Sequence, residues 1–296
     1  MRRLIVNADD FGLTAGVNRA IAEAHTGGIV TSTTLMANAA AFGDAAEVAR
    51  SAGANSRPWS VGCHVVLLDG EPLSPADHVR SLLQPGSENG KAQFRESLND
   101  FAIASFRHKL NAAEIEAEAA AQMERITAAG IALSHFDTHK HAHMFPAVLR
   151  PLLRAARARG IRAVRNPFGQ VWPLPLNNLL RTRQLWKRFA QLNVLRNFAT
   201  GFRSEVEAHG LRTTDGSLGV LVTGVLDLKL FTAIVDSIPE GTWEFVCHPG
   251  YNDGDLDQVR TRLRQSREQE LRLLTSPEAR SVLHNRGIQL INYHEL

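Results

Sequence analysis

The chain has little cysteine and no long apolar run, and each shortage excludes a class of protein. Its only cysteines, Cys63 and Cys247, are too few and too far apart for a disulfide framework, so a reducing cytoplasm fits best. No uncharged apolar run reaches the roughly 18 residues that a membrane-spanning helix needs. The amino terminus also lacks the apolar core of a signal peptide. We therefore expect a soluble, cytoplasmic protein.

Neither sign of charge dominates. The 33 Lys and Arg residues against 30 Asp and Glu residues give a net charge of +3, which does not indicate a nucleic-acid partner. Hydrophobic residues make up 44% of the 296 positions, which is enough for one barrel-sized domain or two small ones. We predict a single domain over residues 1–296, with surface insertions at about 69–108 and 170–215.

Helical and strand-like patterns alternate along the chain. Thr14 can cap a helix that Gly27 and Gly28 would stop, and further helices are expected at 41–53, 111–130, 146–160, 228–238 and 255–274. Strands are expected at 4–6, 29–36, 60–67, 131–137, 161–165, 242–248 and 288–291. This alternation predicts an α/β protein with a mainly parallel sheet.

Two stretches break the alternation. Residues 69–108 are weakly periodic and contain Pro and Gly, as expected of a surface insertion that shapes a substrate site. Residues 179–203 combine an apolar stripe with only positive charge. Such a helix can pack on the domain or lie on an anionic membrane surface. We favour packing, because apolar faces of this kind are ordinary core faces.

The motif around which the chain is organised is Asn7-Ala8-Asp9-Asp10-Phe11-Gly12, which follows the first apolar run. Adjacent carboxylates repel, and burying both without a counter-ion would cost on the order of several kcal/mol. A cation is therefore expected nearby. The alternative is a solvated turn that only starts the next helix.

Ionisable side chains stand where four predicted strands end. These are Asp9 with Asp10, His64, His139 and His248. The carboxyl ends of parallel strands converge on one face. Two imidazoles and one carboxylate around a divalent ion leave positions open for water and substrate, which is typical of a catalytic metal site.

Each histidine also has a structural interpretation. A single His64 or His248 is often a hydrogen-bonded core histidine. The group His139, His141 and His143 suggests that a metal holds at least one ring neutral. Spacing does not decide which of the three reaches the ion, because an extended or a helical stretch would each place some of them on one face.

This combination of motifs resembles the YdjC-like carbohydrate deacetylase family, which includes chitooligosaccharide deacetylases and hopanoid-biosynthesis-associated deacetylases. The resemblance spans nearly the whole chain. It is carried by residues 7–12, 16–18, 28–34, 62–64, 135–146 and 247–249. It implies a (β/α) barrel-like fold of the glycoside hydrolase/deacetylase type. It also implies a metal-dependent hydrolase that removes an N-acetyl group from an acetylated amino sugar, on an oligosaccharide or a glycolipid.

The resemblance also implies roles for individual residues. Asp10, His64 and His139 would hold a divalent ion, Mg²⁺ or Zn²⁺. Asp9 would be the general base, and His248 would be the acid or lie on the oxyanion side. The chain departs from the family pattern at Cys63 and Lys140, neither of which is an implied ligand.

Two further residues are candidates for substrate binding. Arg165, beside a strand end, could bind sugar hydroxyls or a phosphate, although a surface ion pair is an equal alternative. His143 is the second candidate.

The rivals are a metal-dependent phosphoesterase or other amidohydrolase, and a non-catalytic metal- or sugar-binding protein. A homodimer and a peripheral membrane contact through 179–203 stay open.

Overall fold

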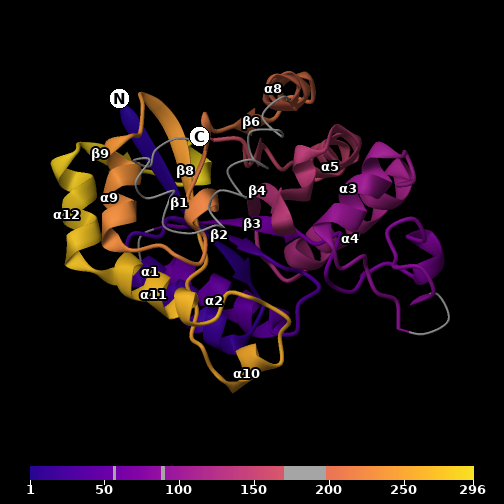
Figure 1. Ribbon diagram of the computed structural model, residues 1–296, viewed down its shortest axis with the longest axis horizontal. Helices are drawn as coiled ribbons and strands as arrows, with labels where there is room; N and C mark the ends of the chain where they lie inside the picture. The colour runs from indigo at the N-terminus through magenta and orange to yellow at the C-terminus, as the bar shows by residue number, and fades with distance from the viewer. Residues whose placement is uncertain (56–57, 88–90, 170–197) are drawn as a thin grey trace.

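A computed structural model describes residues 1–55, 58–87, 91–169 and 198–296 of the chain (Figure 1). Residues 179–197 of the expected amphipathic segment 179–203 therefore lie outside the described residues. The same holds for residues 170–197 of the predicted insertion 170–215. In the described part of the chain, no helix combines the length and the apolar character needed to cross a membrane.

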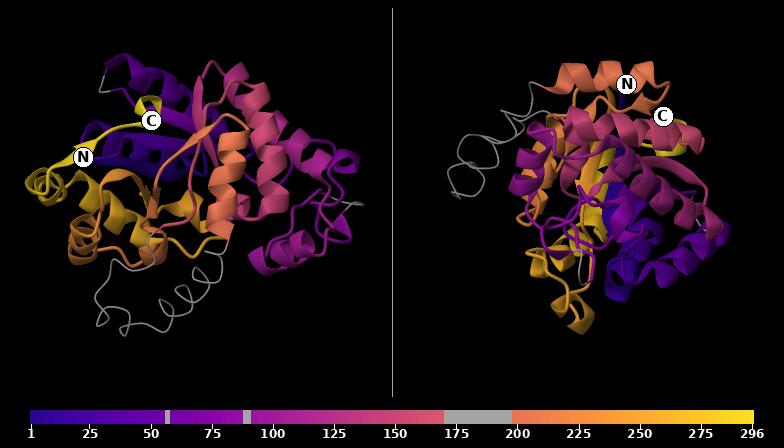
Figure 2. Two further views of the ribbon diagram at one scale, coloured as in Figure 1. Left: turned by 90° about the horizontal axis from the view of Figure 1, so that it is seen from above. Right: turned by 90° about the vertical axis from the view of Figure 1, so that its right-hand side faces the viewer.

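The centre of the fold is a parallel sheet. Its strand order is β6-β5-β4-β3-β2-β1-β8-β7, and β9 also pairs with β1. The sheet is nearly closed into a barrel with surrounding helices, which confirms the predicted fold class (Figures 1 and 2). The strands are β1 Arg2–Phe11, β2 Ser32–Leu35, β3 Ser60–Val65, β4 Leu133–Thr138, β5 Ala163–Val164, β6 Arg212–Thr213, β7 Gly216–Leu218, β8 Gly241–Cys247 and β9 Ile288–Leu290.

Strand β1 lies at the core because it is covered on both faces. Every residue from Leu4 to Phe11 is buried, which is typical of a strand within a parallel sheet that helices cover. β1 pairs with β2 and with β8, so the first and last thirds of the chain meet at this strand. The two termini lie near each other in all views (Figures 1 and 2).

Helices connect most of the strands. They are α1 Ala15–Thr26, α2 Phe42–Asn55, α3 Leu98–Phe106, α4 Ala112–Ala128, α5 Pro146–Ala158, α8 Ala199–Ala208, α9 Leu228–Asp236, α10 Gly254–Asp257, α11 Gln265–Thr275 and α12 Pro277–Asn285. Short 3-10 helices are η1 Ala76–His78, η3 His139–Met144, η5 Val220–Val222 and η6 Tyr293–Glu295. Helices α3, α4 and α5 gather on one side of the sheet, and α9 and α12 on the other (Figure 1).

The predicted ends of α1 are confirmed. The Thr14 side chain accepts a hydrogen bond from the Val17 backbone N–H at 3.1 Å, and Gly27 is the C-cap. The next residue, Gly28, lies where a Cβ would come within 2.4 and 2.5 Å of two backbone carbonyl oxygens. Only glycine therefore fits at this close approach between α1 and α11.

The predicted helix 255–274 is wrong as a single element. The Asp253 side chain caps the short α10, and α11 begins only after Arg264, whose φ of −120° and ψ of −96° are not helical. A further helix, α12, was not predicted, although Ser276 caps it and Pro277 occupies its first position.

The segment predicted to be an insertion, 69–108, is only partly helical. It contains η1, an antiparallel bridge between Leu83 and Phe94, and α3, which Ser97 caps. Its first residue, Asp69, adopts a left-handed conformation with φ of 57°.

Candidate active site

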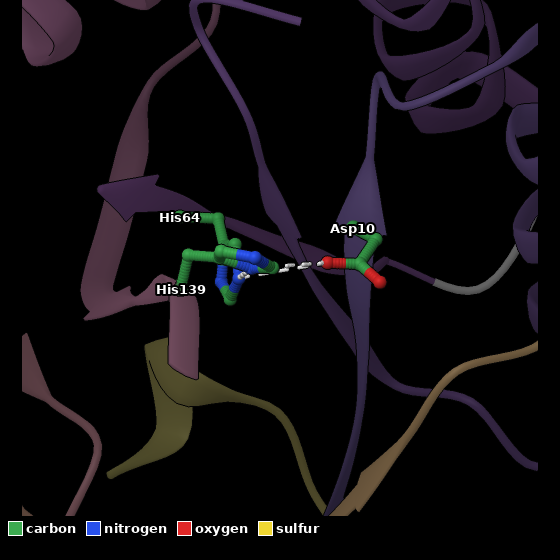
Figure 3. A group of neighbouring side chains, drawn as sticks. All are labelled: Asp10, His64 and His139. Atoms are coloured by element: carbon green, nitrogen blue, oxygen red, sulfur yellow. Dashed lines mark hydrogen bonds and ion pairs between the residues drawn. The ribbon is translucent and has the colours of Figure 1, made fainter. Parts of the chain in front are cut away.

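Three side chains from three strand ends form a compact cluster. Asp10 lies near the end of β1, His64 near the end of β3, and His139 directly after β4. Asp10 Oδ1 is 3.7 Å from His64 Nε2 and 3.6 Å from His139 Nδ1, and the two ring nitrogens are 3.4 Å apart (Figure 3). The structure thus brings together the three residues to which the family resemblance assigned the ion.

The dimensions of the cluster fit a divalent ion. Three ligand atoms at about 2.1 Å from one ion, at tetrahedral angles, lie about 3.4 Å from one another. The observed spacings of 3.4 to 3.7 Å are close to that value. The side chains of Asp10 and His64 are 6% and 2% exposed, whereas that of His139 is 21% exposed, so the cluster is reached from the His139 side. Asp9, His64 and Asp137 form a second acidic group, but Arg165 already supplies positive charge there.

The two carboxylate oxygens of Asp10 face different partners, an arginine and the two histidines of the cluster. Oδ2 accepts a hydrogen bond from the buried Arg267 at 2.6 Å, while Oδ1 faces the two histidines. Burial alone would raise the pKa of Asp10, but Arg267 and His139 outweigh it and hold that pKa well below its ordinary value. Asp10 is also left-handed, with φ of 66°, a backbone conformation that costs a residue with a Cβ about 1 kcal/mol or more.

Asp137 orients His64, and the sequence reasoning gave it no role. Its Oδ1 lies 2.7 Å from His64 Nδ1, which leaves Nε2 of the same ring turned toward the cluster. Burial would lower the pKa of His64, but Asp137, Asp9 and Asp10 together raise it to about 9. A carboxylate behind a ligating histidine fixes the ring and its tautomer. The signal was present, because Asp137 is the last residue but one of β4, the strand that leads into His139.

Asp9 lies beside the cluster and is held by a buried arginine. Arg165 donates to both carboxylate oxygens, at 2.8 and 2.6 Å. Asn7 adds a hydrogen bond of 3.0 Å. Burial would raise the pKa of Asp9, but Arg165 lowers it far below the ordinary value, so Asp9 is ionised. The cation expected beside the two acids is thus supplied, in the protein itself, by Arg165 and Arg267.

The position of Arg165 corrects both expectations for this residue. Its side chain is 0% exposed, so it makes no surface ion pair. Besides Asp9, its guanidinium pairs with Asp137 and with Glu244, at 2.8 Å in the latter case. Because all three guanidinium nitrogens face carboxylates, Arg165 lies behind Asp9 and does not have the open donors that a sugar hydroxyl or phosphate would need. Burial raises the pKa of Glu244, a third acid that the sequence reasoning missed.

The histidines after His139 do not share its position. His143 is fully buried; its Nδ1 lies 2.7 Å from Thr138 Oγ1 and its Nε2 lies 3.2 Å from the Arg165 carbonyl oxygen. Burial holds its pKa well below the ordinary value. The expected substrate contact of His143 is therefore corrected, because both ring nitrogens are engaged inside the protein. His141 is partly exposed, but its ring atom Nδ1 is buried, and burial lowers the pKa of the ring to about 3.

His248 completes the site, directly after β8. Its Nε2 lies 3.9 Å from Asp9 Oδ2, and its backbone N–H donates to the buried Glu270 at 2.6 Å. The side chain is 14% exposed. Asp9 and His248 therefore lie near each other beside the cluster of Asp10, His64 and His139, and His248 is partly exposed.

Fold and cluster together define a β/α-barrel protein whose strand ends carry a candidate metal site beside an acid and a histidine. The model of one family, described as YdjC-like protein, matches residues 3–285. The chain belongs to this family, which confirms the resemblance seen in its motifs.

Two relatives that are similar over nearly their full length are both named carbohydrate deacetylase. A carbohydrate deacetylase from Brevibacillus brevis is 33% identical over 295 residues, covering 99% of both chains. The carbohydrate deacetylase of Mus musculus is 33% identical and covers 99% of this chain and 94% of its own. Among solved structures, a protein from Enterococcus faecalis described as a cellobiose-phosphate cleavage protein superposes with a TM-score of 0.76. It has 26% identity, and the match covers 99% of this chain and 98% of that one.

Proposed function

We propose that the chain is a metal-dependent carbohydrate deacetylase that hydrolyses an N-acetyl group on an amino sugar to acetate and a free amine. The observation that carries this proposal is the cluster of Asp10, His64 and His139 with Asp9 and His248 beside it. The full-length relatives named carbohydrate deacetylase support it.

The cluster is better suited to Zn²⁺ than to Mg²⁺. Two of its three ligand atoms are imidazole nitrogens, whereas Mg²⁺ prefers oxygen ligands and near-octahedral geometry. A divalent ion held there would lower the pKa of a bound water to about 7 and polarise a carbonyl oxygen.

Asp9 would act as the base. Because Arg165 holds the pKa of Asp9 so low, its carboxylate can take a proton only from an acidified water, which ties its role to the ion. Arg165 keeps both oxygens of Asp9 in a fixed position. In this role Asp9 would take one proton from the water whose oxygen attacks the amide carbon.

His248 would act as the acid. Its partly exposed ring lies 3.9 Å from Asp9 Oδ2 and would give a proton to the sugar nitrogen as the C–N bond breaks. The products would be the free amine and acetic acid, which ionises to acetate. The proton taken up by Asp9 would replace, through solvent, the one that His248 gave to nitrogen, so that both residues are restored.

The test is a screen of acetylated amino sugars, soluble oligosaccharides and glycolipids included, for acetate release by the purified protein with its metal content measured. We expect release that chelation abolishes and Zn²⁺ restores. Asp9→Asn should lose a factor of about 10² to 10⁴ in rate while keeping its metal. Unchanged turnover by fully loaded Asp9→Asn would defeat the assignment of the base.

Two rivals give different results in the same screen. The name of the Enterococcus faecalis protein makes phosphate release the natural second readout, because the same ligands can polarise a phosphoryl oxygen. Phosphate without acetate would favour a phosphoesterase. Metal and sugar binding with no product would favour a non-catalytic binding protein.

A further inference from the structure

We propose that Asp69 is a positioning residue. Through its ion pair with Lys140, it holds the turn that carries His139 in the conformation that aims the His139 ligand atom at Asp10 and His64. This inference rests on the proposed metal site. It assigns to the insertion 69–108, through its first residue, a direct part in that site.

The turn after His139 has an unfavourable backbone. Lys140 has φ of 53° and ψ of 25°, and His141 has φ of 55° and ψ of 34°. Residues with a Cβ visit this left-handed region as single positions, and two in succession are rare. A conformation of this kind persists only when its surroundings over-determine it. Contacts outside the turn must therefore hold it.

On its far side, the turn is fastened to strand β4. The backbone N–H of His143 donates to Thr138 Oγ1 at 3.0 Å, and the His143 ring contacts the same hydroxyl at 2.7 Å. These bonds fix the end of the turn. They leave the two left-handed residues between His139 and His143 to be held from elsewhere.

The insertion provides that second attachment. Lys140 Nζ lies 2.5 Å from Asp69 Oδ2 and 3.2 Å from the Glu96 carbonyl oxygen. The side chains of Lys140 and Asp69 are 33% and 19% exposed, so the pair is partly shielded from solvent. Asp69 is itself left-handed and fixed by a 2.9 Å hydrogen bond from its N–H to the Arg95 carbonyl. The Lys140 side chain is thereby drawn to the insertion.

Asp69 also neutralises a positive charge beside the proposed metal site. Lys140 is adjacent to His139, and an unpaired ammonium there would oppose the binding of a divalent cation. Asp69 neutralises it.

The test is Zn²⁺ affinity, measured on the purified full chain by competition with a chromophoric chelator. Asp69→Asn keeps a residue that tolerates the left-handed conformation and removes only the charge. We expect it to weaken Zn²⁺ binding by about tenfold, the lower range for partners of metal ligands. Lys140→Met should weaken it less, because the opposing charge is also lost.

Glycine at position 140, alone and combined with Asp69→Asn, distinguishes a role in holding the backbone of the turn from a general disturbance of the fold. Lys140→Gly removes the ion pair but also the cost of the left-handed conformation. We expect Lys140→Gly to bind Zn²⁺ more tightly than Lys140→Met, and Asp69→Asn added to it to change the affinity by less than about twofold. Rescue by glycine is a result that a merely structural role for the ion pair would not give.

The matched control is Asp236→Asn, which breaks an ion pair of the same 2.5 Å length between the last residue of α9 and Arg286, the residue that follows α12. It should leave Zn²⁺ affinity unchanged. Urea unfolding of the metal-free proteins shows that each variant is folded; if Asp69→Asn is not, the comparison of Lys140→Gly with Lys140→Met decides. Wild-type affinity in Asp69→Asn and Lys140→Met would overturn the inference while leaving the proposed function intact. A wild-type chain that binds no Zn²⁺ would overturn both.

Discussion

Replacing Arg165 with methionine tests the charge network beneath the site. Arg165 is completely buried and pairs with Asp9, Asp137 and Glu244, which come from three different strands. Methionine preserves much of the apolar stem but removes the guanidinium that faces all three acids. The variant therefore leaves buried carboxylates without their counter-ion.

The magnitude follows from the burial of the partners. Removing one partner of a buried ion pair costs about 3 to 5 kcal/mol, because a charge is left uncompensated inside the protein. We expect Arg165→Met to lose at least this much unfolding free energy at pH 7. The matched control is Arg150→Met, whose charge pairs with Glu205 at 2.9 Å but is 61% exposed. Exposed pairs of this kind contribute about 0 to 1 kcal/mol.

The loss should depend on pH in a definite direction. In the wild type the pKa of Asp9 is depressed by Arg165, so its contribution to stability is present above its unfolded pKa and is lost as the pH falls through the folded value. Without Arg165, burial would raise the pKa of Asp9, and protonation would relieve the cost. The gap between wild type and Arg165→Met should therefore be largest near pH 7 and shrink toward pH 4. Urea unfolding at several pH values measures it. A gap no larger than that of Arg150→Met, or one that grows in acid, would refute the reasoning.

Three further predictions concern other parts of the molecule. Asp137→Asn should weaken Zn²⁺ binding about 10- to 100-fold in calorimetry, because His64 loses the carboxylate that orients it, and wild-type affinity would contradict this. Gly28→Ala should cost about 1 to 3 kcal/mol in urea unfolding, since its Cβ would meet two backbone carbonyls, and a neutral change would show that the chain can move there. Burial raises the pKa of Cys63 and Cys247 well above the ordinary value, so a thiol reagent should modify them only on unfolding; fast labelling of the native protein would argue against this environment.

Local signals and strand ends were predictable from the sequence. Thr14 and Gly27 bound a helix through capping chemistry that depends only on neighbours in the chain. The rule that the ends of parallel strands converge predicted that Asp9 with Asp10, His64, His139 and His248 lie on one face. Which of them would hold an ion was implied only by the family resemblance.

The remaining features depend on contacts between distant segments. An arginine in a sequence usually indicates a surface position. Arg165 can be buried only because acids from three strands surround it. Neither helical nor strand spacing predicts where His143 lies. The reason is that Lys140 and His141 have left-handed backbones, which belong to neither element. The ion pair between Asp69 and Lys140 joins positions that are far apart in the sequence, and no local pattern predicts it.

The most direct test of the account is a crystal structure of the Zn²⁺-loaded protein with anomalous data collected at the zinc edge. We predict one strong peak within about 2.0 to 2.2 Å of Asp10 Oδ1, His64 Nε2 and His139 Nδ1, with Asp9 and His248 beside it. At saturating Zn²⁺, a site between these three atoms without a peak, or a peak bound by other residues, would contradict the central claim.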